Sequence, residues 1–102
     1  KTDRGKEDIL FCSSLQRELI ISAFDSLKPN GVLVYSTCSL TPEENEFVVE
    51  YLLEKRNARL SDIEYGEKAL NLTKTDVSKA KRLYPHRHRC AGFFIAKIMK
   101  IE

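Results

Sequence analysis

Residues 32–46 read VLVYSTCSLTPEENE. The run from Val32 to Tyr35 is β-branched and aromatic, which predicts a short strand, and the polar residues after it predict a turn into a helix. In open α/β sheets, ligands bind in the crevice beyond the carboxyl ends of the strands, and Cys38 falls at that end. A cysteine packed as a small apolar residue is the commoner use of this residue type. The spacing alone leaves a nucleophile and a packing residue both open.

The segment before this strand has the period of a helix. Apolar residues recur at three- and four-residue steps and predict a helix of about 20 residues that ends before Pro29. Its apolar face is expected to cover a sheet. Pro29, Asn30 and Gly31 predict a tight turn into the strand, because proline fixes its own φ while asparagine and glycine tolerate positive φ. The periodic residues are Cys12, Leu15, Leu19, Ile20, Ala23, Phe24 and Leu27.

The segment after Cys38 carries the signals of a helix start. We expect Thr41 to cap this helix, Pro42 to take its first position and Glu44 to complete a capping box. The capping role accounts for the Glu44 carboxylate without a catalytic function. Asn45 is expected to brace the loop that carries Cys38 by hydrogen bonds. The buried stripe of the helix is expected to contain Phe47, Val48, Tyr51 and Leu52.

The rest of the chain contains two further strand patterns. Residues 58–63 alternate enough for a short strand, whereas residues 64–80 have no clean period and are interpreted as an irregular connection. Residues 93–99 predict a strong final strand. Because the start of this strand is apolar on both faces, we expect it at the centre of the sheet.

Composition indicates one compact unit. A chain of 102 residues buries about 60 to 70% of its unfolded surface, enough for one modest core. Its 17 Lys and Arg against 15 Asp and Glu give a net charge of +2, which is too balanced to require a nucleic-acid partner on charge alone. Three cysteines without metal-ligand or disulfide spacing favour the reducing cytoplasm. No apolar run approaches the roughly 18 residues of a membrane span, so no membrane partner is expected.

Three motifs point to one family. The first consists of YSTCS (residues 35–39) and PEENE (residues 42–46). The second covers residues 15–31 and ends in a Lys-Pro-Asn-Gly turn, and the third combines RLYPH (residues 82–86) with GFFIAK (residues 92–97). In order and spacing these motifs resemble those of the S-adenosylmethionine-dependent RNA cytosine-5 methyltransferases, which include bacterial 16S rRNA enzymes and eukaryotic and archaeal rRNA and tRNA enzymes.

The resemblance implies an α/β fold, the carboxyl-terminal part of a Rossmann-like methyltransferase fold with a three-stranded mixed sheet and flanking helices. The implied order is helix, strand, helix, strand, loop, strand, with the strand over residues 93–99 antiparallel between the other two. Residues 1–102 then form a single partial methyltransferase domain.

The resemblance also implies a role for Cys38. In this family a cysteine thiolate adds to carbon 6 of cytosine, which activates carbon 5 to take a methyl group from S-adenosylmethionine. The implied substrate is RNA, either tRNA or rRNA. A noncatalytic RNA-binding or assembly module of the same fold is the main alternative. A cysteine-dependent phosphatase is disfavoured because Glu44, six residues after Cys38, stands where such a loop has an arginine.

The family's glycine-rich cofactor loop, its acidic ribose ligand and its Asp-Ala-Pro-Cys segment with a second cysteine have no counterpart among these residues. Because the chain starts at Lys1 rather than methionine, we expect a carboxyl-terminal portion that lacks the cofactor-binding half and is inactive alone. The absent neighbour is expected to leave the strand over residues 32–35 as an open sheet edge. The chain should therefore require its amino-terminal half or associate with itself.

A basic cluster near the final strand is the candidate RNA contact. Arginine forks and histidine donors bind phosphates without reading sequence. A solvated loop is the plain alternative, and a metal site at His86 and His88 is disfavoured because it lacks a third ligand. Cys12 and Cys90 are interpreted as packing residues. The cluster comprises Arg82, His86, Arg87, His88 and Arg89.

Overall fold

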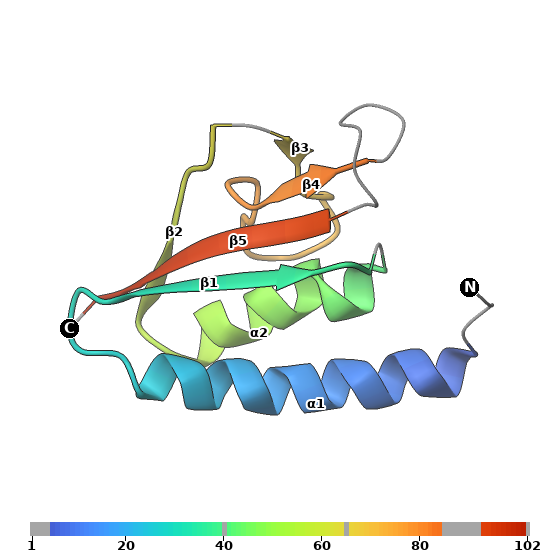
Figure 1. Cartoon of the computed structure of the whole chain (residues 1–102), viewed down its shortest axis with the longest axis horizontal. Coiled ribbons are helices and arrows are strands. Elements are labelled where there is room, and N and C mark those ends of the chain that lie inside the picture. The colour runs from blue at the N-terminus through green and yellow to red at the C-terminus, as the bar shows by residue number, and fades with distance from the viewer. Residues whose placement is uncertain (1–4, 40, 65, 85–92, 102) are drawn as a thin grey trace.

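The computed structural model describes residues 5–39, 41–64, 66–84 and 93–101. Both helices lie on the same side of β1 and β5 in Figure 1. In chain order the elements are α1 (Lys6–Asp25), β1 (Val32–Thr37), the 3-10 turn η1 (Pro42–Glu44), α2 (Glu46–Lys55), β2 (Ala58–Ser61), β3 (Glu67–Lys68), β4 (Lys81–Leu83) and β5 (Phe93–Lys100).

Strand β5 organises the sheet. One edge of β5 pairs antiparallel with all of β1, from Val32 opposite Met99 to Thr37 opposite Phe94. Its other edge is shared, because β4 pairs with residues 93–95 and β2 pairs with residues 97–100. The prediction that the final strand is central and antiparallel is therefore confirmed.

The expected three-stranded mixed sheet is wrong. Over the described residues the sheet has five strands, and all of their pairings are antiparallel. The two strands that the sequence did not reveal are β3, of two residues, and β4, of three. Strands this short are below the length at which an alternating pattern is detectable. Part of the segment interpreted as irregular is thus paired into the sheet.

The two faces of the sheet differ in burial. On the face toward the helices, Phe94, Ala96 and Ile98 of β5 are fully buried. They belong to one core cluster with Ile20 and Phe24 of α1 and Val48, Val49 and Leu52 of α2. On the opposite face the structure leaves Val32 43%, Val34 56% and Phe93 41% exposed. The helices therefore cover one face of the sheet.

Helix α1 has the predicted length of 20 residues, but its apolar residues form two stripes rather than one. Ile20 and Phe24 are buried in the core, whereas Leu15 is 45% and Leu19 is 57% exposed. The expectation that all of these residues cover the sheet is therefore wrong. The outer stripe continues toward the start of the helix with Phe11, which is 70% exposed.

The predicted tight turn between α1 and β1 is present, with a positive φ at Asn30 but not at Gly31. Asn30 has a φ of 67°, and a Cβ added at Gly31 would lie 2.8 Å from the carbonyl oxygen of Lys28. Backbone hydrogen bonds tie the turn to the end of β5, from Asn30 N–H to Lys100 O and from Lys100 N–H to Gly31 O, both at 2.9 Å. This clamp fixes where β1 begins.

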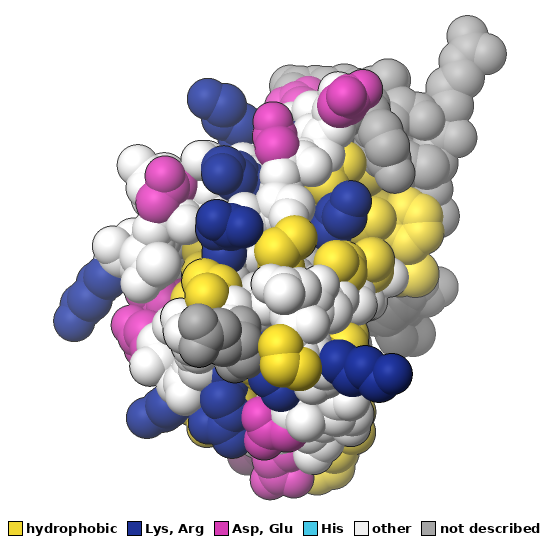
Figure 2. Space-filling view, turned by 90° about the vertical axis from the view of Figure 1, so that its left-hand side faces the viewer, with side chains coloured by type: hydrophobic (Ala, Val, Ile, Leu, Met, Phe, Trp, Pro, Cys, Tyr) yellow, Lys and Arg dark blue, Asp and Glu magenta, His cyan; other side chains and the backbone are white. Residues whose placement is uncertain are grey.

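Charge on the surface is mixed. On the face seen in Figure 2, Lys and Arg side chains lie interspersed with Asp and Glu, with apolar side chains between them. This agrees with the near balance of the composition. Within the described part of the chain, no helix is both long and apolar enough to cross a membrane.

Candidate active site at the end of strand β1

Cys38 directly follows the last residue of β1, and its thiol is free and exposed. Cys12, also free, is partly buried in α1. Cys90 lies outside the described residues. Strand β1 therefore carries an accessible cysteine at its carboxyl end, where the sequence predicted one.

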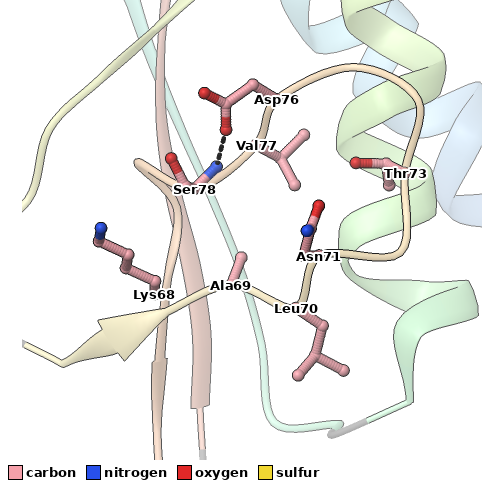
Figure 3. A pocket seen from close by; sticks show the side chains of 8 residues that line it. All are labelled: Lys68, Ala69, Leu70, Asn71, Thr73, Asp76, Val77 and Ser78. Carbon is pink, nitrogen blue, oxygen red and sulfur yellow. Dashed lines mark hydrogen bonds between the residues drawn. The ribbon is translucent and has the colours of Figure 1, made fainter.

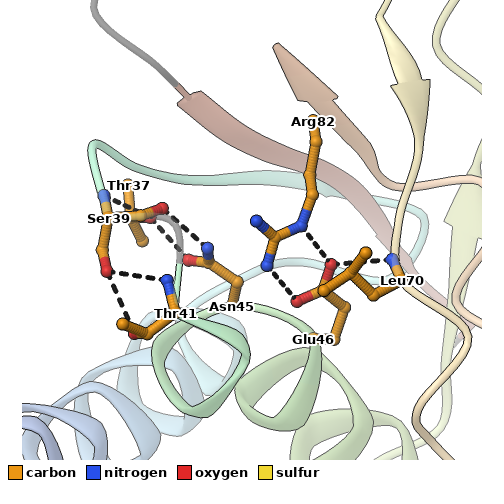
Figure 4. A network of polar contacts seen from close by, with 7 residues as sticks. All are labelled: Thr37, Ser39, Thr41, Asn45, Glu46, Leu70 and Arg82. Atoms are coloured by element: carbon orange, nitrogen blue, oxygen red, sulfur yellow. Dashed lines mark hydrogen bonds and ion pairs between the residues drawn. The ribbon is translucent and has the colours of Figure 1, made fainter. Parts of the chain in front are cut away.

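The residues on either side of Cys38 are held by a closed ring of hydrogen bonds (Figure 4). The hydroxyl of Thr37 donates to Oδ1 of Asn45 at 2.6 Å, and Nδ2 of Asn45 donates to the carbonyl oxygen of Ser39 at 2.7 Å. The backbone N–H of Ser39 donates back to Oγ1 of Thr37 at 3.2 Å. The bracing role expected of Asn45 is confirmed.

Ser39 and Thr41 form a second set of hydrogen bonds, at the end of the loop that leads into η1. The hydroxyl oxygens of Ser39 and Thr41 are 3.0 Å apart, and the N–H of Thr41 donates to Oγ of Ser39 at 3.2 Å. The Thr41 side chain therefore bonds within the loop rather than to the next helix, and it makes no capping hydrogen bond. The expected capping box from Thr41 to Glu44 is wrong, because α2 begins at Glu46 with Asn45 as its N-cap residue.

Tyr35 connects β1 to η1. Its hydroxyl donates to the backbone carbonyl of Glu44 at 2.7 Å, and its ring meets Phe94 edge-on with 6.3 Å between centroids. Burial, together with the nearby Glu44 charge, raises the pKa of the Tyr35 phenol well above its ordinary value. The phenol is therefore a neutral donor. It anchors η1, the turn that follows the Cys38 loop, to strand β1.

A buried ion pair lies next to this loop on α2. The Glu46 carboxylate accepts from Nε of Arg82 at 2.6 Å and from Nη2 at 2.7 Å, and the two side chains are 0% and 2% exposed. The same carboxylate accepts the N–H of Leu70 at 2.9 Å. Hydrogen bonding to Glu46 raises the pKa of Arg82 against the opposing effect of burial. Strand β4 and the loop before it are thus fixed to the start of α2.

The segment between β3 and β4 encloses a pocket of about 290 Å³ (Figure 3). Its backbone is docked on α2, because Glu50 accepts the N–H groups of Lys74 and Thr75 at 2.7 and 3.2 Å. In the pocket wall Asp76 accepts the N–H of Ser78 at 2.9 Å, which lowers the pKa of Asp76. The pocket shares no lining residue with the Cys38 loop.

Residues 1–99 match the family model described as 16S rRNA methyltransferase RsmB/F. The chain belongs to the RsmB/F family. It is 44% identical to the human 28S rRNA (cytosine(4447)-C(5))-methyltransferase, in an alignment that covers 100% of this chain and 14% of the human protein. It is 40% identical to the tRNA (cytosine(49)-C(5))-methyltransferase of Pyrococcus abyssi, over 90% of this chain and 32% of that protein. The resemblance to RNA cytosine-5 methyltransferases is confirmed.

Solved structures of similar proteins share the fold. A methyltransferase homologue from Pyrococcus horikoshii superimposes with a TM-score of 0.91 at 47% identity, over 96% of this chain and 34% of that one. NSun6 from Pyrococcus horikoshii, solved with the S-adenosylmethionine analogue SFG, gives a TM-score of 0.86 at 38% identity, over 98% of this chain and 25% of that one. The RsmB/F chain described here thus spans about a third or less of these proteins.

The basic cluster of this RsmB/F chain divides between described and undescribed residues. Arg82 is buried in the pair with Glu46, so the phosphate contact expected of it is incompatible with its position. His86, Arg87, His88 and Arg89 lie outside the described residues, and their RNA contact stays a prediction. Among the residues that are described, no group of three His, Cys, Asp or Glu side chains is placed to hold a metal.

The sequence interpretation missed Glu46 and Tyr35 as parts of this RsmB/F site. A signal for Glu46 was present, since it lies three residues before Val49 and so on the same, inward side of α2. A carboxylate on an inward face implies a buried cationic partner. Tyr35 and Val34 are neighbours on β1, so their side chains lie on opposite faces of the sheet. With Val34 exposed, Tyr35 lies on the face toward the helices, and the alternation of a strand was a signal for this.

Proposed function

We propose that Cys38 is the nucleophile of an RNA cytosine-5 methyltransferase and that this chain contributes the cysteine-bearing part of the active site. One observation carries the proposal: a free, exposed thiol at the carboxyl end of β1, with both neighbouring residues held by hydrogen bonds. Its substrate class, tRNA or rRNA, follows from the names of the relatives.

Cys38 acts in this proposal by covalent addition. Its thiolate forms a carbon–sulfur bond to carbon 6 of the cytosine, and the electron pair of the 5,6 double bond moves toward carbon 5, which becomes nucleophilic. Carbon 5 uses this pair for the bond to its new methyl group. When carbon 5 then loses its proton, the pair of the broken carbon–hydrogen bond re-forms the 5,6 double bond, and the carbon–sulfur bond breaks with its pair on sulfur. The thiolate is thereby regenerated for another turnover.

S-adenosylmethionine supplies the methyl group in this family. Three glycines are described, and they lie in separate parts of the chain rather than in one glycine-rich loop. Gly5 precedes α1 with open space around it, Gly31 is packed against Lys28 in its turn, and Gly66, at a φ of 88°, lies against the Arg82 carbonyl. We therefore assign no residue of this chain to the cofactor, and the proposal for the chain is confined to the addition and release of the thiol.

The test uses a chimera in which residues 1–102 replace the matching third of the Pyrococcus abyssi tRNA methyltransferase. We expect the chimera to methylate tRNA and to form a covalent adduct with tRNA that contains 5-fluorocytosine, because the carbon–fluorine bond blocks release. Cys38→Ala should abolish both. Cys12→Ala, the control at the partly buried cysteine, should retain both.

Two results contradict the proposal. If Cys38→Ala keeps a near wild-type rate, the cysteine is structural and the noncatalytic module becomes the better interpretation. A folded chimera that fails to methylate before any substitution leads to the same conclusion.

A further inference from the structure

Asn45 occupies the N-cap position of α2, yet its side chain does not cap the helix. An asparagine at this position ordinarily accepts a hydrogen bond from an N–H of the first helical turn. Here the backbone carbonyl of Asn45 accepts from Val48 and Val49, both at 3.1 Å, while the amide side chain turns away to the Cys38 loop. The side chain is 0% exposed, so its hydrogen bonds have no competition from water.

The amide uses both of its polar atoms on the two neighbours of Cys38. Oδ1 accepts from the Thr37 side chain, and Nδ2 donates to the Ser39 backbone. Only a group with one donor and one acceptor about 2 Å apart can serve both contacts, and the primary amide is the side chain that has this pair. Because Ser39 N–H returns to Thr37, the ring fixes the backbone on both sides of the cysteine.

We propose that Asn45 is the positioning residue for Cys38: the ring of Thr37, Asn45 and Ser39 holds the loop so that the thiol points away from the core toward the substrate. This inference rests on the proposed function of Cys38. Asn45 touches neither thiol nor substrate in the proposal and acts through its two neighbours. Strand β1 on one side and α2 on the other supply the rigid supports for the ring.

A pair of substitutions at Thr37 separates positioning from packing. Thr37→Val keeps the shape of the side chain and removes the hydroxyl, whereas Thr37→Ser keeps the hydroxyl and removes a methyl group. In the chimera, Thr37→Val should slow adduct formation by about 10- to 100-fold, the effect of misplacing a reacting group by roughly 1 Å. Thr37→Ser should stay within about threefold of the unsubstituted rate, because the ring is intact. If Thr37 served through packing, the valine variant would be the faster of the two.

Asn45→Ala should slow adduct formation by a similar factor and leave the Michaelis constant for tRNA within about threefold, since the ring does not contact the substrate. The matched control is Val49→Ala, at a fully buried residue of α2, which disturbs the core and leaves the hydrogen-bonding groups of the ring unchanged. Both are compared at a temperature where each is folded. Equal rates for Asn45→Ala and Val49→Ala overturn the proposal, as does a valine variant at Thr37 that equals the serine variant.

A measurement on the chain itself reports on the ring without catalysis. The Ser39 amide should exchange its hydrogen faster with solvent in Thr37→Val than in Thr37→Ser, because the acceptor Oγ1 is lost. Equal exchange in the two variants means that the ring does not form in solution. The proposed function of Cys38 is tested by a different result: if Cys38→Ala still methylates tRNA, that function is wrong, whether or not the ring forms.

Discussion

Nε and Nη2 of Arg82 bind different oxygens of the Glu46 carboxylate, so the first residue of α2 holds a strand that lies 36 residues later in the chain. Removing one partner leaves the other charge buried and unpaired, and such losses cost about 3–5 kcal/mol. We therefore expect Glu46→Ala to lower the free energy of unfolding by that amount in urea titrations.

Two comparisons sharpen this prediction. Glu46→Leu combined with Arg82→Met removes both charges and should recover much of the loss, because a hydrophobic pair replaces the ion pair. Asp25→Ala breaks the ion pair between Asp25, 48% exposed, and Arg56, 37% exposed. Because this pair is in contact with solvent, its loss should lower the free energy of unfolding much less. If the two single variants, Glu46→Ala and Asp25→Ala, unfold at the same urea concentration, the buried pair is not what holds β4.

Tyr35→Phe should lower the free energy of unfolding by about 0.5–1.5 kcal/mol, because the Glu44 carbonyl loses its hydrogen bond. The same contact predicts a pH dependence. The pKa of Tyr35 is raised above its ordinary value of 10.0, so the folded protein retains a proton that the unfolded chain releases. The stability that Tyr35 provides is present below pH 10 and is lost as the pH rises above it. Denaturation followed from pH 8 to 11 should show a fall that is weaker in the phenylalanine variant.

The chain alone should show no binding of S-adenosylmethionine in titration calorimetry. Its four glycines are far apart in the sequence, whereas cofactor recognition in this fold needs a glycine-rich turn and an acidic ribose ligand. Micromolar binding by a monomer would show that the chain holds a cofactor site of another kind.

The open edge of β1, with exposed valines beside it, should make the isolated chain self-associate. Strand β1 is the first strand in the sheet order, and its residue Val34 is 56% exposed. Val34→Lys should shift the sedimentation profile toward monomer, because a charge beside this edge disfavours its burial. Leu72→Lys is the matched control, since Leu72 is also 56% exposed but lies in the loop before β4. A monomeric unsubstituted chain, or equal effects of the two lysines, contradicts the prediction.

The elements that were predicted correctly from the sequence are those whose residue pattern fits only one kind of structure. The strand at residues 93–99 was expected at the centre because its start is apolar on both sides, and β5 has that position. The turn at Asn30 and Gly31 was expected from its residue types: asparagine tolerates the positive φ found at Asn30, and a side chain at Gly31 would meet the Lys28 carbonyl. In both cases the physical requirement is local, so the residue type alone reveals it.

The errors arose where several interpretations fit the same residues. Leu15, Leu19 and Ile20 all match a helical period, and nothing in the spacing tells which stripe of α1 meets the core. The start of α2 was misplaced because Thr41 and Asn45 are both favourable N-cap residues. The roles of Glu46 and Arg82 depend on a contact between distant segments, which local patterns do not encode.

The pairing of β5 sets the order in which the sheet assembles. Strands β1, β2 and β4 each pair with β5, and β5 comes last of them along the chain. During synthesis, β1 therefore leaves the ribosome without its partner and waits until Met99, opposite Val32, has been made. Over that interval α1 and α2 are the elements that form from neighbouring residues, whereas the sheet closes late and across long loops. The ring around Cys38 closes within residues 37–45, but β1, the strand that leads into it, is paired with β5 only after residues 94–99 have followed.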